Sequence, residues 1–95
     1  MNKFIKHLNK YNFYFYRTHH GAECDLVIVR GNKPIACIEI KLSNAPEIPK
    51  GFISSIDDLK TNKNFIVTPE SDNYTYKNIR ICSLQTFIQK YLNKI

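Results

Sequence analysis

Two neighbouring segments of the chain have the apolar pattern of buried β-strands but carry charged residues. Apolar residues dominate positions 22–30 and 34–42, in short runs rich in Val and Ile that predict two strands. Strands buried on both faces are nearly continuously apolar. Glu23 and Asp25 interrupt the first run, and Glu39 and Lys41 interrupt the second. Because an isolated charge in an apolar interior is costly unless it is paired or coordinated, these four residues are candidates for a functional site.

The remaining elements follow from the spacing of apolar positions along the chain. Helical spacing predicts helices over 3–11, 50–61 and 84–92, the last with Ser83 as its N-cap. Further strands are predicted over 13–16, 64–68 and 79–82, whereas Pro, Gly and polar residues predict turns or loops over 18–21, 43–51 and 69–78. The predicted order is αβββαββα, an α/β (α+β) arrangement.

The segment before the charged strands combines an aromatic run with two histidines. Phe13–Tyr16 fill both faces of a strand, which favours packing in the core over a platform for stacking bases. His19 and His20 fall in a turn that ends at a glycine, where exposure to solvent is favoured over contact with a substrate.

Length and composition are those of a small globular domain. The 95 residues predict a single domain, 1–95, and a content of 43% hydrophobic and 23% charged residues argues against a disordered or fibrous protein. No apolar run approaches the roughly 18 residues that span a bilayer, and no signal-peptide core is present, so we expect a cytoplasmic protein. Cys24, Cys37 and Cys82 lack the spacing of a zinc site and are predicted to be buried free thiols.

The formal net charge of +6 suits a polyanionic partner such as nucleic acid. The basic residues are scattered along the chain. Arg17, Lys50 and Lys60 are candidates for phosphate contacts, although a solvated surface explains each equally well.

The two charged strands are predicted to form an antiparallel hairpin with the charged residues on one face. Side chains alternate along a strand, so Glu23 shares a face with Asp25, and Glu39 shares a face with Lys41. Only a loop with an odd number of residues puts both pairs on the same face. With the three-residue loop Gly31–Lys33, Asp25 lies opposite Glu39 and Glu23 lies opposite Lys41.

Directly opposed carboxylates suit a divalent cation. Opposed Cβ atoms are about 4.5–5.5 Å apart, and two carboxylates so close repel unless a cation compensates them. Mg²⁺ or Mn²⁺ takes oxygen ligands and accepts substrate phosphate oxygens. The predicted ligands are Asp25, Glu39 and the carbonyl of Ile40, while Glu23 is either a further ligand or the ion-pair partner of Lys41. Lys41 is predicted to orient or deprotonate the attacking water, or to neutralise charge on the scissile phosphate.

The residues of these strands resemble two groups of proteins. Asp25 followed by Glu39-Ile40-Lys41 resembles the PD-(D/E)xK nuclease superfamily. Over residues 12–92, the motifs at 15–18, 21–27 and 38–41 are similar to the C-terminal domain of unknown function found in many bacterial and archaeal AAA-type ATPases.

The resemblance implies a restriction-endonuclease-like core, with a central mixed sheet flanked by helices. It also implies Asp25, Glu39 and Lys41 as catalytic residues, Mg²⁺ or Mn²⁺ as the cofactor and action on nucleic acid. A homodimer and an ATPase partner are the protein partners that it suggests.

The sequence departs from these families in two respects. No Gly-x-x-x-x-Gly-Lys-Ser/Thr loop is present, so no nucleotide hydrolysis is predicted. Many superfamily nucleases have an acidic residue on the leading helix, whereas residues 3–11 contain none.

Three functional hypotheses therefore stand side by side. The first is a metal-dependent phosphodiesterase that acts on or binds nucleic acid. The second is a non-catalytic accessory domain, in which Asp25, Glu39 and Lys41 form a salt-bridge cluster inherited from a nuclease. The third is a small basic nucleic-acid binder without site chemistry, and it depends on the net charge alone.

Overall fold

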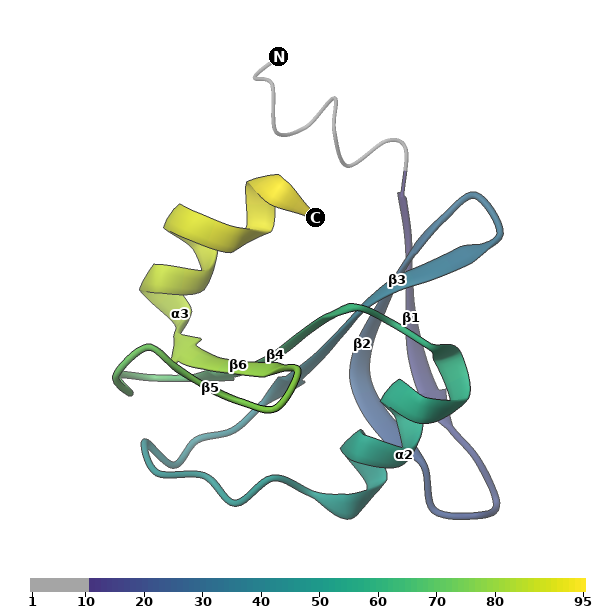
Figure 1. The fold of residues 1–95 in the computed structure, drawn as a ribbon, viewed down its shortest axis with the longest axis horizontal. Coiled ribbons are helices and arrows are strands. Elements are labelled where there is room, and N and C mark those ends of the chain that lie inside the picture. Colours follow the sequence, from purple (N-terminus) through teal and green to yellow (C-terminus); the bar gives the residue numbers. More distant parts are fainter. Residues whose placement is uncertain (1–10) are drawn as a thin grey trace.

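A six-stranded mixed sheet with helical segments on both faces forms the fold in the computed structural model, which describes residues 11–95 (Figure 1). The strands are β1 (Tyr11–Arg17), β2 (Glu23–Arg30), β3 (Lys33–Ile40), β4 (Lys63–Thr68), β5 (Tyr74–Tyr76) and β6 (Ile79–Ser83), and the helical segments are α2 (Lys50–Leu59), α3 (Leu84–Thr86), η1 (Phe87–Tyr91) and η2 (Leu92–Lys94). Across the sheet the order is β1-β2-β3-β4-β6-β5. The β1–β2, β2–β3 and β5–β6 pairs are antiparallel, while β3–β4 and β4–β6 are parallel. The predicted α+β class with a central mixed sheet is confirmed.

The element order differs from the prediction within the described residues. The helix predicted over 3–11 lies outside them except for Tyr11, which begins β1. The predicted loop 69–78 contains β5, a three-residue edge strand whose Tyr-Thr-Tyr sequence has high strand propensity. The predicted helix 84–92 changes its winding along its length and continues to Lys94, and Ser83 caps it as predicted, because the Ser83 hydroxyl accepts a hydrogen bond from the Thr86 N–H at 3.1 Å. The specific αβββαββα order is therefore not confirmed.

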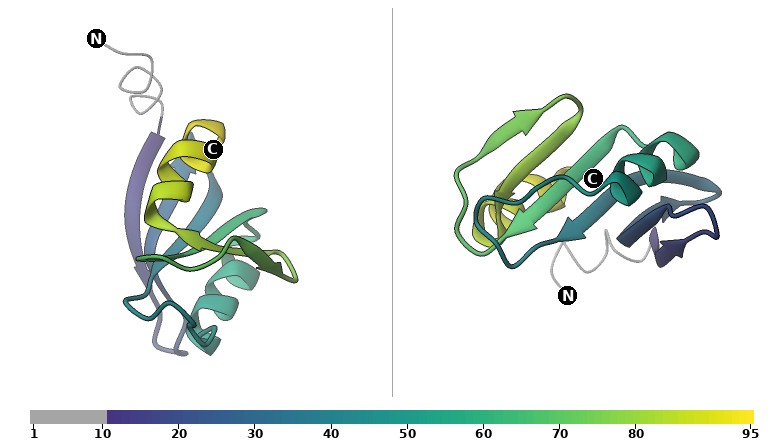
Figure 2. Two further views of the ribbon diagram at one scale, coloured as in Figure 1. Left: turned by 90° about the vertical axis from the view of Figure 1, so that its left-hand side faces the viewer. Right: turned by 90° about the horizontal axis from the view of Figure 1, so that it is seen from below.

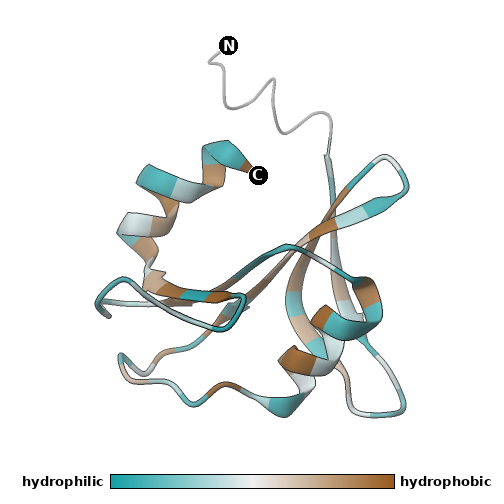
Figure 3. Ribbon diagram, viewed as in Figure 1, coloured by the Kyte–Doolittle hydropathy of each residue, from teal (hydrophilic) through white to brown (hydrophobic). Residues whose placement is uncertain are grey.

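Side chains of successive strand residues point to opposite faces, so the sheet has two faces to cover. The helix α2 covers one face, and α3, η1 and η2, which together form the C-terminal segment, cover the other. Phe52 and Ile56 of α2 pack on one face with Ile66 of β4. The C-terminal segment packs on the other face, where Phe87 meets the ring of Phe65 edge-on at 5.1 Å. Figure 2 shows the two segments on opposite sides of the sheet, and Figure 3 shows apolar and polar positions alternating along strands and helices. Two apolar layers thus share one sheet.

The aromatic run in β1 is mostly exposed, so the prediction that it packs in the core is wrong. Phe13, Tyr14 and Phe15 are 44%, 54% and 59% exposed, and only Tyr11 of this strand is buried. The reason lies in the sheet order: β1 is an edge strand, and no described element covers it on its outer side. His19 and His20 are exposed in the following turn, as predicted.

The start of α2 lies against the turn between β1 and β2. A Cβ atom built on Gly51 would lie 2.6 Å from the carbonyl oxygen of Gly21 and 3.4 Å from the amide nitrogen of Glu23. Gly51 is therefore required for this close approach. The contact joins α2 to the end of the sheet where β2 begins.

Two further predictions concern thiols and membranes. The three cysteines are free and buried, as predicted. A hydrogen bond between the Cys24 and Cys37 thiols, together with burial, raises the pKa of Cys24, so this thiol stays protonated.

None of the helices in residues 11–95 has the length and apolar character needed to cross a membrane.

Candidate metal centre

The register of the β2–β3 hairpin brings the two predicted carboxylates to adjoining positions. The predicted three-residue loop is wrong, because Arg30 pairs with Lys33 across a two-residue turn. An extra residue in β3, Ile35, then forms a β-bulge that restores the predicted register, so that Val27 lies opposite Cys37. The extra residue in the bulge therefore has the effect expected of a third loop residue, because it shifts the pairing of β2 with β3 by one position.

A second bulge separates Glu23 from the predicted cluster. Tyr14 pairs with Val27 and Tyr16 pairs with Cys24, so β2 holds one more residue than β1 in this interval. The side chains of Cys24 and Val27 consequently pack in the same apolar layer beneath α2. Glu23 is exposed next to Cys24, and among the described residues the ion pair of Lys41 is with Glu39. The predicted pairing of Glu23 with Lys41 is therefore wrong.

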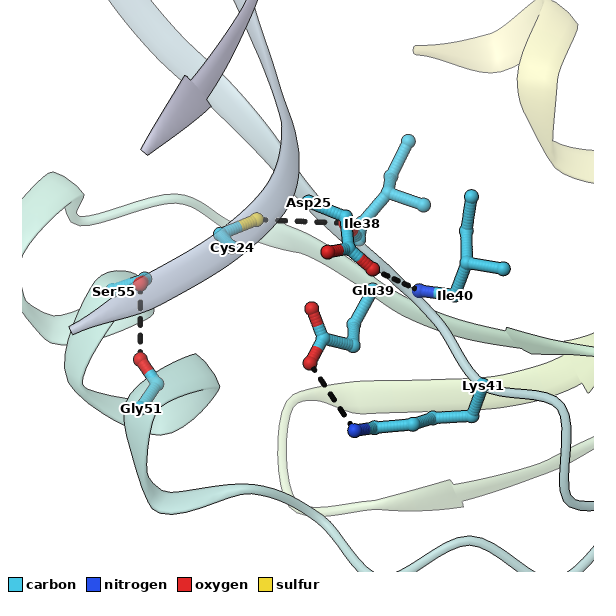
Figure 4. A network of polar contacts seen from close by, with 8 residues as sticks. All are labelled: Cys24, Asp25, Ile38, Glu39, Ile40, Lys41, Gly51 and Ser55. Atoms are coloured by element: carbon cyan, nitrogen blue, oxygen red, sulfur yellow. Dashed lines mark hydrogen bonds and ion pairs between the residues drawn. The ribbon is translucent and has the colours of Figure 1, made fainter. Parts of the chain in front are cut away.

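Asp25 lies in this second bulge and contacts the next strand through its side chain. Its Oδ2 accepts a hydrogen bond from the backbone N–H of Ile40 at 2.9 Å (Figure 4). The Lys41 N–H donates to the Val67 carbonyl of β4 at 2.9 Å. Because a trans peptide directs its C=O opposite to its N–H, the Ile40 carbonyl points toward the β2 side, where Asp25 lies.

Glu39 is the buried carboxylate of the cluster. It is 7% exposed, and its Oε1 is buried without a hydrogen-bond partner among the described residues. Its Oε2 lies 3.7 Å from Nζ of Lys41. Burial, followed by the negative charge of Asp25, raises the pKa of Glu39, while the charge of Lys41 opposes the shift. Figure 4 shows the carboxylates of Asp25 and Glu39 directed into the same space, with Lys41 reaching back to Glu39.

Lys41 joins this cluster to a neighbouring hollow. A hollow of about 540 Å³ is lined by Lys41, by the loop that follows it and by Lys50 at the first position of α2. The exposed Glu47 lines the same hollow. The hollow is wide enough for part of a ligand, with lysines at two of its sides.

The residues fit an oxygen-preferring cation such as Mg²⁺ or Mn²⁺ better than a metal bound by His and Cys, such as Zn²⁺. Residues 11–95 contain no group of three His, Cys, Asp or Glu side chains arranged to hold a metal ion. Mg²⁺, however, is commonly bound through one or two carboxylates, with water and substrate phosphate completing its shell. Asp25, Glu39 and the Ile40 carbonyl supply oxygen donors of this kind. A cation there would compensate the repulsion that raises the pKa of Glu39.

The structure brings together Asp25, Glu39 and Lys41, as the sequence predicts, and leaves out Glu23. Gly51 was not identified from the sequence, although it positions α2 beside this end of the sheet. A signal for it was present: a glycine in the first turn of a helix, where it has no turn to make, indicates a close approach of backbone to backbone.

Comparison with known proteins gives one finding. Residues 1–87 match a family described as a domain of unknown function (DUF4143). No curated protein and no solved structure matches the chain.

Proposed function

The chain belongs to the DUF4143 family of domains of unknown function, and we propose that Asp25, Glu39 and Lys41 form a divalent-metal site of the PD-(D/E)xK nuclease type, acting on or binding nucleic acid. The observation that carries the proposal is Glu39, a buried carboxylate between a second carboxylate and a lysine, whose Oε1 has no hydrogen-bond partner within residues 11–95. An arrangement of this kind is unfavourable for the folded protein by itself. A bound cation would make it favourable.

The roles of the individual residues follow from their surroundings. Bound Mg²⁺ or Mn²⁺ would supply Lewis-acid polarisation of a phosphate oxygen. Asp25 and Glu39 would hold it, with the Ile40 carbonyl directed to the same side. Lys41 is 37% exposed at its side chain and lines the adjoining hollow, so its ammonium group would be accessible to a phosphate bound there. There it would orient the attacking water or stabilise negative charge on the scissile phosphate.

Titration calorimetry with MnCl₂, combined with cleavage of DNA and RNA oligonucleotides, tests the proposal. We expect the wild-type protein to bind one ion, and Glu39→Gln to abolish this binding. Asp25→Asn and Lys41→Ala should each lower cleavage by roughly 10²–10³-fold, the size of effect seen when one charge-stabilising group is removed.

Glu47→Gln provides a matched control, because Glu47 is an exposed carboxylate on the neighbouring hollow and lies outside the cluster. It should leave both measurements unchanged. Cleavage that is equally strong in Asp25→Asn and Lys41→Ala would contradict the catalytic role, and ion binding that survives Glu39→Gln would contradict the metal site.

A second function is favoured by the hydrogen bond from Ile40 to Asp25. This bond employs one carboxylate oxygen in joining β2 to β3, which is a structural task. The second candidate is therefore a non-catalytic accessory or interaction domain, in which Asp25, Glu39 and Lys41 are a degenerate nuclease site. It predicts no affinity for Mn²⁺, so the same calorimetric titration separates the two candidates.

A further inference from the structure

Two hollows at one end of the sheet are lined by positive side chains. Their volumes are about 360 and 350 Å³, and they share part of their lining, including Lys63 at the start of β4 and Lys94 in the C-terminal segment. The positive side chains that line them are Arg30, Lys33, Lys63, Lys77, Arg80 and Lys94. We call these six residues the basic band.

Carboxylate side chains do not compensate the charge of the basic band. Among residues 11–95, no Asp or Glu lines either hollow, and the ion pair that joins Lys41 to Glu39 lies outside both hollows. Beside the band, the Tyr11 hydroxyl donates a hydrogen bond to the main-chain oxygen of Ile95 at 2.8 Å. The band gathers six of the eleven lysines and arginines of the described residues, so it is a strongly positive surface.

Neutral groups hold the cations in place. Nζ of Lys63 donates to the carbonyl of Lys94 at 2.6 Å. The guanidinium of Arg80 donates to the side-chain oxygen of Asn73 at 3.0 Å and lies 4.9 Å from the centre of the Tyr91 ring. These contacts orient the side chains while leaving their charge uncompensated, which preorganises a surface for anions.

We propose that the basic band binds the phosphate backbone of a nucleic acid. Phosphates spaced along a strand neutralise several neighbouring cations at once and release bound counterions, which is a favourable term for a cluster of like charges. Both arginines of the band add planar donors that match phosphate oxygens. The choice of a nucleic acid over an acidic protein rests on the proposed function, whereas the positive surface itself does not.

The end of the basic band at Lys33 lies far from the candidate metal centre, whereas Arg80 lies in register with Ile38, the neighbour of Glu39, across β4. Lys33 begins β3 and Glu39 lies near its other end, which places them about 20 Å apart at the rise of a β-strand. Neither hollow is lined by Asp25, Glu39 or Lys41, so we expect binding at the band to need no metal ion. The two sites are separable by experiment.

Fluorescence anisotropy with labelled 20-nucleotide single strands and 20-base-pair duplexes, measured in EDTA at several NaCl concentrations, tests the proposal. Lys33→Glu combined with Lys77→Glu reverses two exposed charges of the band. We expect affinity at low salt to fall by about tenfold or more. The slope of log affinity against log NaCl concentration should become shallower by about two phosphate contacts.

Lys60→Glu combined with Lys90→Glu is the matched control, because it changes the net charge equally at exposed positions outside the band. It should stay within about threefold of wild type, since distant exposed charges are largely screened. Equal weakening by both double variants, or no binding by the wild-type protein, would overturn the proposal. Poly-glutamate that displaces the oligonucleotide as effectively as unlabelled DNA would overturn the choice of partner.

Glu39→Gln separates this proposal from the proposed function. It should lose Mn²⁺ binding, a result that concerns the metal site alone. Loss of Mn²⁺ binding in the Lys33→Glu/Lys77→Glu variant would show that the two sites are not separate and would also count against the band. A wild-type protein that binds oligonucleotide through the band but binds no Mn²⁺ would refute the metal site alone. Circular dichroism confirms that each variant is folded.

Discussion

Glu39 is an ionisable side chain in a buried and largely apolar environment. It shares the apolar side of β3 with Cys37, which packs under α2, yet one oxygen of its carboxylate has no hydrogen-bond partner in the described part of the chain. The raised pKa means that the folded protein holds the Glu39 proton more tightly than the unfolded chain does. The stability contributed by protonated Glu39 is complete below the unfolded pKa, near 4.3, and is lost as pH rises through the raised pKa.

Glu39→Gln should therefore stabilise the metal-free fold at pH 7. We expect a gain in the free energy of unfolding, because glutamine carries no charge that burial and Asp25 disfavour, and the gain should disappear as pH falls toward 4. Urea unfolding between pH 4 and 8 in EDTA measures it, with the exposed Glu47→Gln as the control. A variant less stable than wild type at pH 7 would mean that ionised Glu39 stabilises the fold through Lys41.

Asp25 combines a structural bond with a charge, and two substitutions separate these roles. Asp25→Asn keeps an oxygen that accepts from the Ile40 N–H, so the free energy of unfolding in EDTA should stay near wild type. Asp25→Ala removes the acceptor and should lower that free energy by about 1 kcal/mol. Both variants should lose Mn²⁺ binding in calorimetry. Tight ion binding by Asp25→Asn would show that the Asp25 charge is dispensable.

At the scale of elements, two bulges and one glycine position the candidate site. The bulge at Ile35 restores the register between β2 and β3, and the bulge at Asp25 directs Glu23 away from the cluster. Gly51 then lets α2 begin beside the β1–β2 turn. Each bulge, like the close contact at Gly51, involves a single residue, yet each changes which side chains lie next to one another.

Gly51→Ala tests the close approach of α2. In an open helix, alanine stabilises relative to glycine by about 1 kcal/mol. Here the new Cβ would lie 2.6 Å from the Gly21 carbonyl oxygen, so we expect a net loss of about 1–3 kcal/mol in urea unfolding, typical of overpacking. Asp57→Ala, at an exposed position of α2, should be neutral or slightly stabilising. A higher melting temperature for Gly51→Ala would contradict the contact.

At the scale of the whole molecule, one sheet carries two apolar layers and two charged regions. Phe52 anchors α2 on one face and Phe87 anchors the C-terminal segment on the other. Lys33 of the basic band and Glu39 of the candidate metal centre lie near opposite ends of β3. Because both layers depend on β3 and β4, we expect the described part of the chain to unfold as a single unit.

Phe52→Ala and Phe87→Ala test this cooperativity. Both side chains are buried, at 0% and 6% exposure, so each truncation should cost about 3–5 kcal/mol. Far-UV circular dichroism and tyrosine fluorescence should report the same transition in both variants. Ile88→Ala, at a half-exposed position, is the control. Separate transitions for the two signals in Phe87→Ala would show that the C-terminal segment unfolds independently.

The sequence by itself determined the element types of the sheet core and the identity of the charged cluster. Apolar periodicity located β2, β3, β4, β6 and α2 to within a few residues, because burial on one face imposes that period locally. The charges of Asp25, Glu39 and Lys41 were noticeable because strands of this kind exclude them. These are local properties of the chain.

Tertiary structure alone decided the rest. Whether Phe13–Phe15 are covered depends on β1 being an edge strand, and strand order is not a local property. The bulge at Asp25 turned Glu23 away from Lys41, because one extra residue reverses the faces of the side chains beyond it, and the bulge at Ile35 restored the register between β2 and β3. The basic residues are scattered along the sequence, and only the meeting of strand ends with the C-terminal segment gathers six of them into one band.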